Sequence, residues 1–228
     1  FNTNLMKTIV VTGTSSGIGY EICAQAAKLR YNVISVSRNI KPLSKIDGIL
    51  SYSVDITDKK SINAFVEDLR KRKIKIDILI NNAGYLSNEL FSETSYKSFK
   101  DTFDVNVFGL AEITRSLIPF ITKIGHVINI SSIGGVNGSK KFPGLAVYSS
   151  SKAAVIALTE VLAEEYSDGP SFNVLALGAV QTKMLKEAFP DYNADTKPEE
   201  MAKYIIDFAL NGSNLFNGKL ISVSNSNP

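Results

Sequence analysis

The chain has 228 residues, 44% of them hydrophobic, and a formal net charge of +3. This length allows one large domain with a substantial core, and the small net charge gives no indication of a nucleic-acid partner. One cysteine, Cys23, excludes an intrachain disulfide. One histidine, His126, leaves too few ligands for a typical zinc site, so we expect no metal.

The amino-terminal segment and the length of the apolar runs bear on the cellular location of the protein. The amino-terminal segment lacks the apolar stretch of a secretory signal, and no run reaches the ~18 apolar residues of a membrane span. We therefore expect a cytoplasmic protein with no membrane partner. Residues 1–5 precede Met6, and we expect them to be a remnant added upstream of the natural start.

Strand-like and helix-like segments alternate along the chain. Runs rich in β-branched residues predict strands at 8–13, 32–37, 77–84, 126–131 and 172–177, with weaker candidates at 49–55 and 218–224. Apolar residues at helical spacing predict helices at 17–30, 57–72, about 95–122, 148–166 and 197–210. The alternation predicts an α/β fold: one doubly wound parallel sheet of about seven strands, with helices on both faces, in a single domain over 1–228.

A glycine-rich loop, "TGTSSGIGY", follows the first expected strand, with Gly13, Gly17 and Gly19 in the spacing G-x-x-x-G-x-G. The first glycine allows a tight turn, the second lets the backbone approach a pyrophosphate, and the third lets the helix pack on the sheet. Such glycines can mark an ordinary turn, but their place between a first strand and a first helix favours a dinucleotide site. The site would also include Ser15, Ser16 and Ile18.

The end of the second strand bears on which dinucleotide binds. NAD-dependent enzymes usually place an acidic residue there for the ribose 2′-hydroxyl, whereas this chain has Ser37 followed by Arg38. A guanidinium can pair with the 2′-phosphate of NADP. We therefore expect NADP(H) to be favoured over NAD(H), the alternative being that Arg38 only faces solvent.

The segment "YSSSK" places Tyr148 four residues before Lys152. On a helix these side chains lie on one face, with the ammonium close to the phenol. On its own, the pair is more typical of two polar residues on a wet surface.

Taken together, the motifs resemble the short-chain dehydrogenase/reductase family over nearly the whole length. "TGTSSGIG", the aspartate in "SVDITD", "NNAG", "DVNVFG", "INISS" and "YSSSK" occur in the family's order. The resemblance implies a Rossmann-type fold, an NAD(P) cofactor and an oxidoreductase that interconverts a carbonyl and a secondary alcohol.

The resemblance also implies roles for four side chains. Tyr148 would be the general acid or base, and Ser132 would hold the substrate oxygen. Lys152 would bind the nicotinamide ribose, and its charge, together with that of the positive nicotinamide ring, would lower the pKa of Tyr148, which for a free phenol is about 10. Asn106 would fix a water that connects Lys152 to solvent. The rival Ser131 would alternate to the opposite side of an extended strand.

Further cofactor contacts follow from the same resemblance. Asp55 and Ile56 would meet the adenine, and Asn82, Ala83 and Gly84 would pass behind the adenosine ribose. Gly178, Val180 and Thr182 match the contacts with the carboxamide and the phosphates.

Three departures from the family pattern stand out. The interval between Ser132 and Tyr148 is longer than usual, with a glycine-rich insertion that can loop outward. Leu177-Gly178 replaces the common Pro-Gly, so this turn loses the rigidity of proline. The tail "GKLISVSNSNP" lacks the usual Asp-Gly-Gly, which puts one common subunit interface in doubt.

The expected partner is a small-molecule carbonyl or alcohol, held by a partly apolar cleft. Members of the family usually pair through the helices that carry Asn106 and Tyr148, so we expect a homodimer, with a tetramer left open. A nucleotide-sugar epimerase or dehydratase and a non-catalytic NADP-sensing regulator are the alternatives. The expected cleft residues are Phe142, Leu145, Val147, Ala179 and Met184, with Lys140, Lys141 and Lys183 at the rim.

Overall fold

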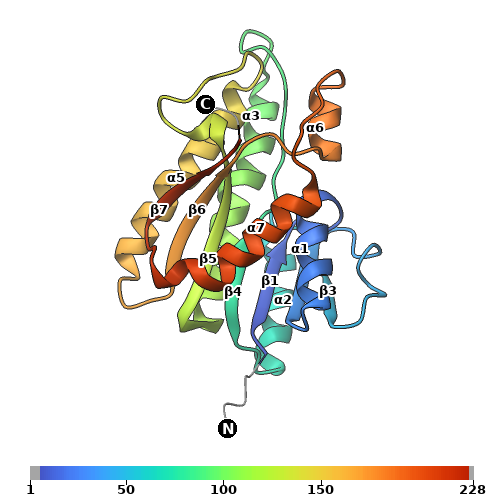
Figure 1. Ribbon diagram of the computed structural model, residues 1–228, viewed down its shortest axis with the longest axis vertical. Helices are drawn as coiled ribbons and strands as arrows, with labels where there is room; N and C mark the ends of the chain where they lie inside the picture. Colours follow the sequence, from blue (N-terminus) through green and yellow to red (C-terminus); the bar gives the residue numbers. More distant parts are fainter. Residues whose placement is uncertain (1–5, 226–228) are drawn as a thin grey trace.

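The computed structural model describes residues 6–225, so the expectation for residues 1–5 lies outside the described residues. All strand pairs are parallel, and the seven-stranded sheet has the order β3-β2-β1-β4-β5-β6-β7 (Figure 1). The predicted doubly wound sheet is confirmed. The strands are β1 (Thr8–Thr12), β2 (Asn32–Ser37), β3 (Ile49–Ser53), β4 (Ile76–Asn81), β5 (Ile121–Ser132), β6 (Ser171–Leu177) and β7 (Lys219–Val223).

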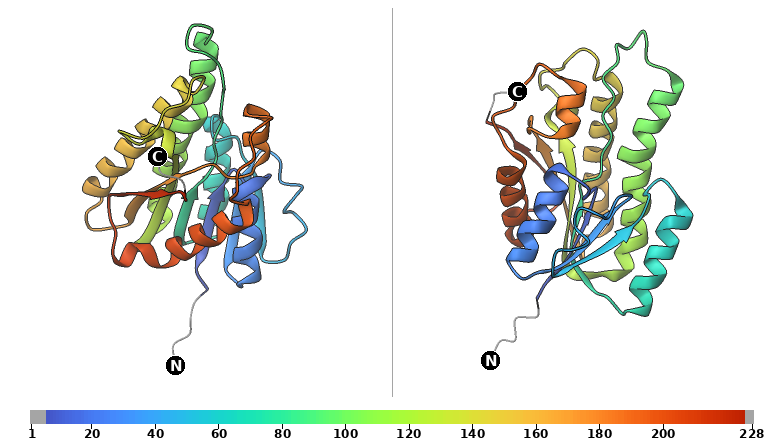
Figure 2. Two further views of the ribbon diagram at one scale, coloured as in Figure 1. Left: turned by 45° about the horizontal axis from the view of Figure 1, so that its top comes forward. Right: turned by 90° about the vertical axis from the view of Figure 1, so that its right-hand side faces the viewer.

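Helices cover both faces of the sheet (Figures 1 and 2). On one face, α1 (Gly17–Lys28) packs beside α7 (Pro198–Asn211). The other face is covered by α2 (Lys59–Lys71), α4 (Leu110–Leu117) and α5 (Ala146–Glu165). The order of the strands reverses between β1 and β4, and ligands of such sheets bind at the carboxyl ends beside this point.

The alternation of side chains along β1 shows how the core is divided. Ile9 and Val11 point into the cluster that includes the buried residues of α1 and α7, whereas Val10 points into the cluster with α2 and α4. All three are essentially inaccessible to solvent. A strand covered on both faces needs apolar residues at every position, which is why these strands appear in the sequence as unbroken apolar runs.

The helix predicted at about 95–122 is wrong in its details. It consists of α3 (Tyr96–Phe103), a π-helical segment η1 (Asp104–Gly109) and α4, followed by the short 3₁₀ segment η2 (Ile118–Phe120) that contains Pro119. Strand β5 begins at Ile121, five residues earlier than expected. The short helix α6 (Lys183–Ala188) was not predicted, because six residues are too few to show a helical period.

Two buried asparagines tie the sheet to the helices beneath it. Asn81 Nδ2 donates to Asn129 Oδ1 at 2.8 Å and to Thr114 Oγ1 of α4 at 2.7 Å. Asn129 Nδ2 donates in turn to Thr159 Oγ1 of α5 at 2.9 Å. Buried polar groups of this kind are strongly favoured to remain paired, so the chain of bonds fixes the two helices relative to β4 and β5.

Helix α5 is long and apolar, and it packs in the core of the domain. Among residues 6–225, it is the one helix whose length and composition would suffice to cross a membrane. Val155 and Ile156 pack against Leu110 and Val174 in a buried cluster, as expected of a core helix. Its first turns carry Tyr148 and Lys152.

Candidate active site

A cavity of about 650 Å³ opens at the carboxyl ends of the strands. Its lining includes Arg38 and Asp55 at the ends of β2 and β3, and the glycine loop after β1. Ser132, Tyr148 and Lys152 also line it, from β5 and α5. Residues far apart in the sequence therefore meet in one site, as the predicted topology requires.

The glycine loop is packed too tightly for side chains. Gly13 has φ +73, and a Cβ there would lie 2.6 Å from Ala83 Cα. A Cβ on Gly19 would lie 2.3 Å from Gly13 O. Asn82 Nδ2 donates to Thr12 O at 3.0 Å and to Gly13 O at 3.1 Å, so its side chain fixes the loop.

The amino terminus of α1 faces the cavity. Ser15, Ser16, Gly17 and Ile18 all line it, and the N-cap residue Ser16 makes no side-chain capping hydrogen bond. The first N–H groups of a helix carry partial positive charge and lack partners within the helix. Together with the packed glycines, this arrangement fits the pyrophosphate of a dinucleotide.

The opposite wall of this part of the cavity contains Ser37, Arg38, Asp55 and Ile56. Ser37 is buried, and its Oγ donates to Asn39 O at 2.9 Å. Burial alone would raise the pKa of Asp55, but hydrogen bonds from Thr57 and the charge of Arg38 lower it overall. The guanidinium is therefore close enough to act on groups in the cavity.

Lys152 is buried at the other end of the cavity, 3% exposed. Its Nζ donates to Ile130 O at 3.0 Å and lies 5.7 Å from the centre of the Tyr148 ring. The helical spacing predicted from "YSSSK" thus places the ammonium beside the phenol inside the cavity, and the wet-surface alternative is wrong. A Cβ on Gly84 would lie 3.5 Å from Lys152 Nζ, so Gly84 forms the adjacent wall.

The two serines that end β5 have different surroundings. Ser132 lines the cavity and hydrogen-bonds to the Tyr148 hydroxyl, and its Oγ also accepts from Gly134 N at 3.2 Å. Ser131 is buried, and its Oγ donates to Lys152 O at 2.8 Å. The longer interval between Ser132 and Tyr148 has not separated them. The extra residues form the exposed part of the 136–142 loop.

The residues of the chain by themselves shift the pKa of Tyr148 upward. The lowering expected from Lys152 together with the nicotinamide ring stays a prediction. Burial raises the pKa of Tyr148 to about 12, opposed only by the hydrogen bond from Ser132. Burial also lowers the pKa of Lys152 to about 8. Both shifts have one cause: the site disfavours each charged form. Tyr148 is therefore a neutral phenol over the whole physiological range.

Asn106 lies in the π-helical segment and is completely buried. Its amide exchanges two hydrogen bonds with the backbone of Tyr85, donating to the carbonyl at 2.8 Å and accepting from the N–H at 2.7 Å. Asn106 Oδ1 and Lys152 Nζ flank the same face of Gly84, at 3.6 and 3.5 Å from a Cβ built there. π-Helical turns occur frequently at functional sites, and this one turns Asn106 toward the cavity end that holds Lys152.

A loop anchored at its base covers part of the cavity. Val180 and Thr196 form an isolated parallel bridge, and Gln181 N donates to Thr196 O at 2.9 Å. Between these ends lies α6, capped by Thr182 Oγ1, which accepts from Leu185 N at 3.2 Å. We call residues 181–195 the roof loop, and Figure 2 shows α6 at the carboxyl ends of the strands. Gly178, Val180 and Thr182 line the cavity beneath it.

Two residues of the expected cleft, Val147 and Lys141, do not line the cavity. Phe142, Leu145, Ala179 and Met184 line the cavity, as do Lys140 and Lys183. Val147 is instead buried in the protein, and the ammonium of Lys141 bonds to Val136 O at 2.6 Å outside this cavity. Sequence reasoning missed Leu86, Ile133, Phe189 and Tyr192, which come from loops with no periodic pattern.

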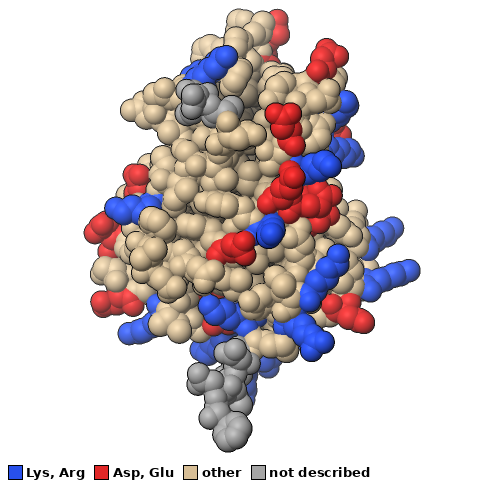
Figure 3. Space-filling view, viewed as in Figure 1, with Lys and Arg blue, Asp and Glu red and all other residues tan. Residues whose placement is uncertain are grey.

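Charged groups elsewhere suggest no further centre. Acidic and basic side chains are mixed over the face that carries α7, in keeping with the small net charge (Figure 3). Among residues 6–225, no group of three His, Cys, Asp or Glu side chains is placed to hold a metal ion.

A doubly wound sheet with a glycine-lined cavity at its switch point defines a dinucleotide-binding α/β protein. The short chain dehydrogenase family matches residues 7–193, which is most of the chain. The protein belongs to this family and is an NAD(P)-dependent oxidoreductase.

Relatives and solved structures agree with this assignment. The chain is 28% identical to a 3-oxoacyl-[acyl-carrier-protein] reductase of Thermotoga maritima over an alignment of 239 residues, which covers 95% of this chain and 96% of the relative. It is 30% identical to an NADPH-dependent pterin aldehyde reductase of Arabidopsis thaliana, over 80% of this chain and 78% of the relative. A structure of ElxO with NADP bound superposes with a TM-score of 0.83 at 27% identity, covering 96% of this chain and 97% of the other.

Proposed function

We propose that the protein is an NADP-dependent oxidoreductase that interconverts a carbonyl group and a secondary alcohol, with Tyr148 as general acid and base. The observation that carries this proposal is the meeting of Tyr148, Ser132 and Lys152 in the cavity that also contains the glycine loop. A proton donor and a cofactor cradle in one cavity are what carbonyl reduction requires of the protein.

In the reductive direction, Tyr148 donates its phenolic proton to the substrate oxygen. Because burial raises the pKa of Tyr148 to about 12, the phenol carries that proton at neutral pH. Ser132 holds the same oxygen by a hydrogen bond and stabilises the charge that develops on it. The nicotinamide, when bound, supplies or accepts the hydride. In the oxidative direction Tyr148 takes the proton back.

Lys152 and Asn106 act behind Tyr148. The Lys152 ammonium, 5.7 Å from the phenol ring, favours proton release from Tyr148 as the substrate oxygen becomes negative. We assign Asn106 to fixing a water beside Lys152, through which Tyr148 recovers its proton from solvent. The polar atoms of Asn106 and Lys152 that flank Gly84 support this assignment.

The cofactor would be held along the whole cavity. We place the pyrophosphate at Gly17, Ile18 and the two serines before them, and the adenosine between Arg38, Asp55, Ile56 and the segment 82–84. Arg38 would pair with the 2′-phosphate, since Ser37 stands where an NAD enzyme has a carboxylate. The NADPH dependence of the Arabidopsis relative and the NADP in ElxO support this preference.

We also propose a cytoplasmic homodimer with one domain over 1–228. The pairing surface would be formed by η1, α4 and α5, where Phe108 and Val161 are 61% and 53% exposed. Ala153 and Ala157 are also exposed on the same helix as Val161. An apolar stripe of this kind on a long helix suits a two-fold interface, in which each helix packs on its copy.

The test is a screen of aldehydes and ketones as substrates, in which the absorbance of NADPH measures turnover. Tyr148→Phe is the matched variant. Loss of the hydroxyl should lower kcat by at least about 100-fold, the usual scale for a general acid. NADPH binding, measured by its fluorescence, should remain. Equal turnover by the two proteins would remove Tyr148 from the mechanism.

A further inference from the structure

A second cavity, of about 610 Å³, shares a wall with the candidate active site. Phe142 and Leu145 line both cavities. Leu90 and Phe91 from the loop after β4 form one side of the second cavity. The segment that leads into α5 and the first turn of α5 complete the lining, with Lys141, Pro143, Gly144, Ala146 and Ser149. Two segments remote in sequence therefore enclose an apolar space directly beside the reacting end of the first cavity.

The wall of the second cavity exposes large apolar side chains. Leu90 is 51% exposed, Phe91 70% and Phe142 51%. Single exposed apolar residues are ordinary, but a contiguous set beside a catalytic cavity is typical of a ligand-binding surface. We call this set, with Pro143 and Ala146, the tail subsite.

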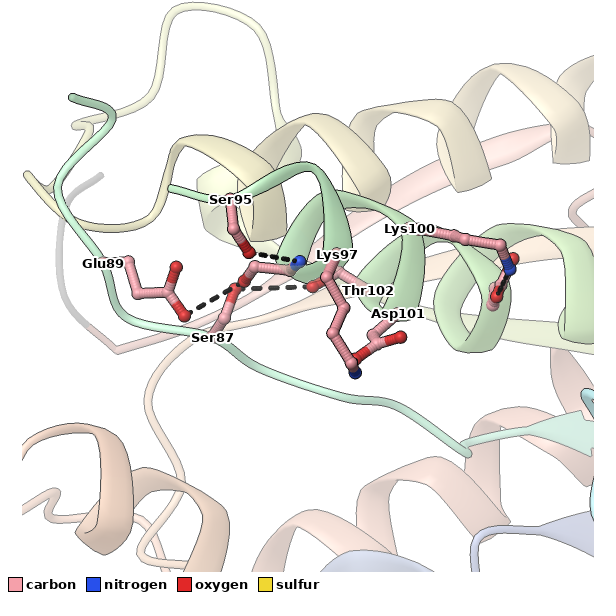
Figure 4. A network of polar contacts seen from close by, with 9 residues as sticks. Ser87, Glu89, Ser95, Lys97, Lys100, Asp101 and Thr102 are labelled. Atoms are coloured by element: carbon pink, nitrogen blue, oxygen red, sulfur yellow. Dashed lines mark hydrogen bonds and ion pairs between the residues drawn. The ribbon is translucent and has the colours of Figure 1, made fainter. Parts of the chain in front are cut away.

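The tail subsite is formed in advance by hydrogen bonds. Glu89 N donates to Gly144 O at 3.0 Å, which joins the two segments of the wall. The Glu89 carboxylate accepts from Ser98 Oγ at 3.0 Å, one of several contacts that hold this loop against α3 (Figure 4). Asn88 Nδ2 donates to Ala188 O of the roof loop at 2.7 Å. A site built in this way avoids most of the entropy cost of ordering its walls upon binding.

Space in the first cavity limits what else it can hold. The first cavity, of about 650 Å³, has to hold both the dinucleotide that we place between Arg38 and Lys152 and the reacting carbonyl group beside Tyr148. A longer substrate must continue past the shared wall, at Phe142 and Leu145. Lys140 Nζ lies 5.4 Å from the centre of the Phe142 ring and helps to hold that ring in place.

We propose that the tail subsite binds the apolar chain of an elongated carbonyl substrate, whose carbonyl group lies at Tyr148 and whose chain passes Phe142. This inference rests on the proposed function and specifies its substrate class. Phe142 is then a specificity-determining residue, because it lies between the two compartments. Phe91, 70% exposed, lies on the wall of the second cavity.

The test compares aliphatic methyl ketones from butanone to decanone as substrates with NADPH. In the wild-type enzyme, kcat/KM should rise about fourfold for each methylene that becomes buried in the tail subsite. Phe91→Asp places a charge in that wall at an exposed position and should reduce the ratio of kcat/KM for decanone to that for butanone by tenfold or more. Tyr96→Asp, 84% exposed and outside both cavities, is the matched control and should keep the wild-type ratio.

A second measurement keeps the inference testable without turnover. A dodecyl chain carrying a fluorescent label should bind the wild-type and Tyr96→Asp proteins, and should bind Phe91→Asp at least tenfold more weakly. If the wild type reduces short and long ketones equally well, the tail subsite is wrong and the proposed function stands. If no ketone is reduced but the labelled chain binds as expected, the proposed function fails and the subsite remains. If Phe91→Asp alters the oligomeric state and leaves chain-length preference unchanged, the surface is a subunit contact and the inference is overturned.

Discussion

Asn106 Nδ2 donates a 2.9 Å hydrogen bond to Ser151 Oγ, and Ser151 Oγ donates at 2.7 Å to the carbonyl of Tyr148. The π-helical turn is thereby connected to the helical turn that carries the phenol. Both Asn106 and Ser151 are fully buried, so losing either partner would leave an unpaired polar group. The position of Tyr148 therefore depends on a residue 42 positions earlier in the chain.

The cofactor preference can be tested at Arg38. Arg38→Asp should weaken NADPH binding at least about tenfold and leave NADH bound as well or better, because a carboxylate repels the 2′-phosphate. Dissociation constants for both cofactors, from their fluorescence, measure this. Lys41→Asp makes the same charge change outside the cavity and should preserve the preference. An identical response of the two variants would show that only general charge attracts NADPH.

The pH dependence of reduction should report on Lys152. Burial lowers the pKa of Lys152 to about 8, whereas Tyr148 keeps its proton up to about 12. We expect kcat/KM for reduction to be level near neutrality and to fall as pH rises through about 8, where the ammonium beside Tyr148 loses its proton. Lys152→Met should have lower activity and no inflection there. The same inflection in both proteins would assign it to another group.

Replacing each of the two serines at the end of β5 should have a different effect: one substitution should lower the activity and the other the stability. Ser132→Ala removes a hydrogen-bond donor from the substrate oxygen and should lower kcat about 100-fold. Ser131→Ala removes the 2.8 Å bond to Lys152 O and should lower the free energy of unfolding by about 1 kcal/mol. Steady-state kinetics gives kcat and urea unfolding gives the free energy of unfolding for both variants. If Ser131→Ala lowered kcat and Ser132→Ala lowered only the stability, the roles of the two serines would be exchanged.

His126 should make the protein sensitive to acid. It is buried, its Nδ1 faces Ala209 O at 3.1 Å, and its Nε2 lies 2.9 Å from Asn173 Nδ2. Burial lowers the pKa of His126 from 6.5 to about 4. Below pH 6.5 the unfolded chain binds a proton that the folded protein refuses, so stability falls as pH drops toward 4 and this contribution is constant below that.

The lowered pKa of His126 corresponds to a loss of about 3 kcal/mol in the free energy of unfolding between neutral pH and pH 4. His126→Gln keeps a donor and an acceptor but does not titrate. Urea unfolding at neutral pH and near pH 4 should show the wild type losing about 3 kcal/mol more than the variant. Parallel losses in both proteins would mean that carboxylates alone cause the acid sensitivity.

The sequence predicted those parts of the fold that follow from short-range patterns. Strands such as β1 and β6 are covered on both faces and appear as apolar runs, and the four-residue spacing of Tyr148 and Lys152 needs only a helix to bring them together. The π-helical turn around Asn106 has no such periodic signal. Its geometry is set by contacts with Tyr85 and Ser151, which lie far away in the sequence.

The pKa shifts in the site also could not be predicted from the sequence. The family resemblance implied that Lys152 and the nicotinamide ring would lower the pKa of Tyr148, but nothing in the sequence indicated that burial within the chain raises it. The tail subsite was missed for a related reason. Leu90 and Phe142 are 52 residues apart but line one cavity, where the bond from Glu89 N to Gly144 O joins their segments.

The roof loop is closed at its base, where Val180 pairs with Thr196 and Gln181 Oε1 accepts from Ala194 N at 2.7 Å. These bonds join the two ends of the loop to each other, so its base is closed without a contribution from the catalytic side chains. Evolution or engineering can exchange Met184, Phe189 and Tyr192 for other side chains, or lengthen the loop, while the sheet and the proton-donating machinery stay intact. A changed roof loop would then give the protein new substrates while the catalytic residues stay the same.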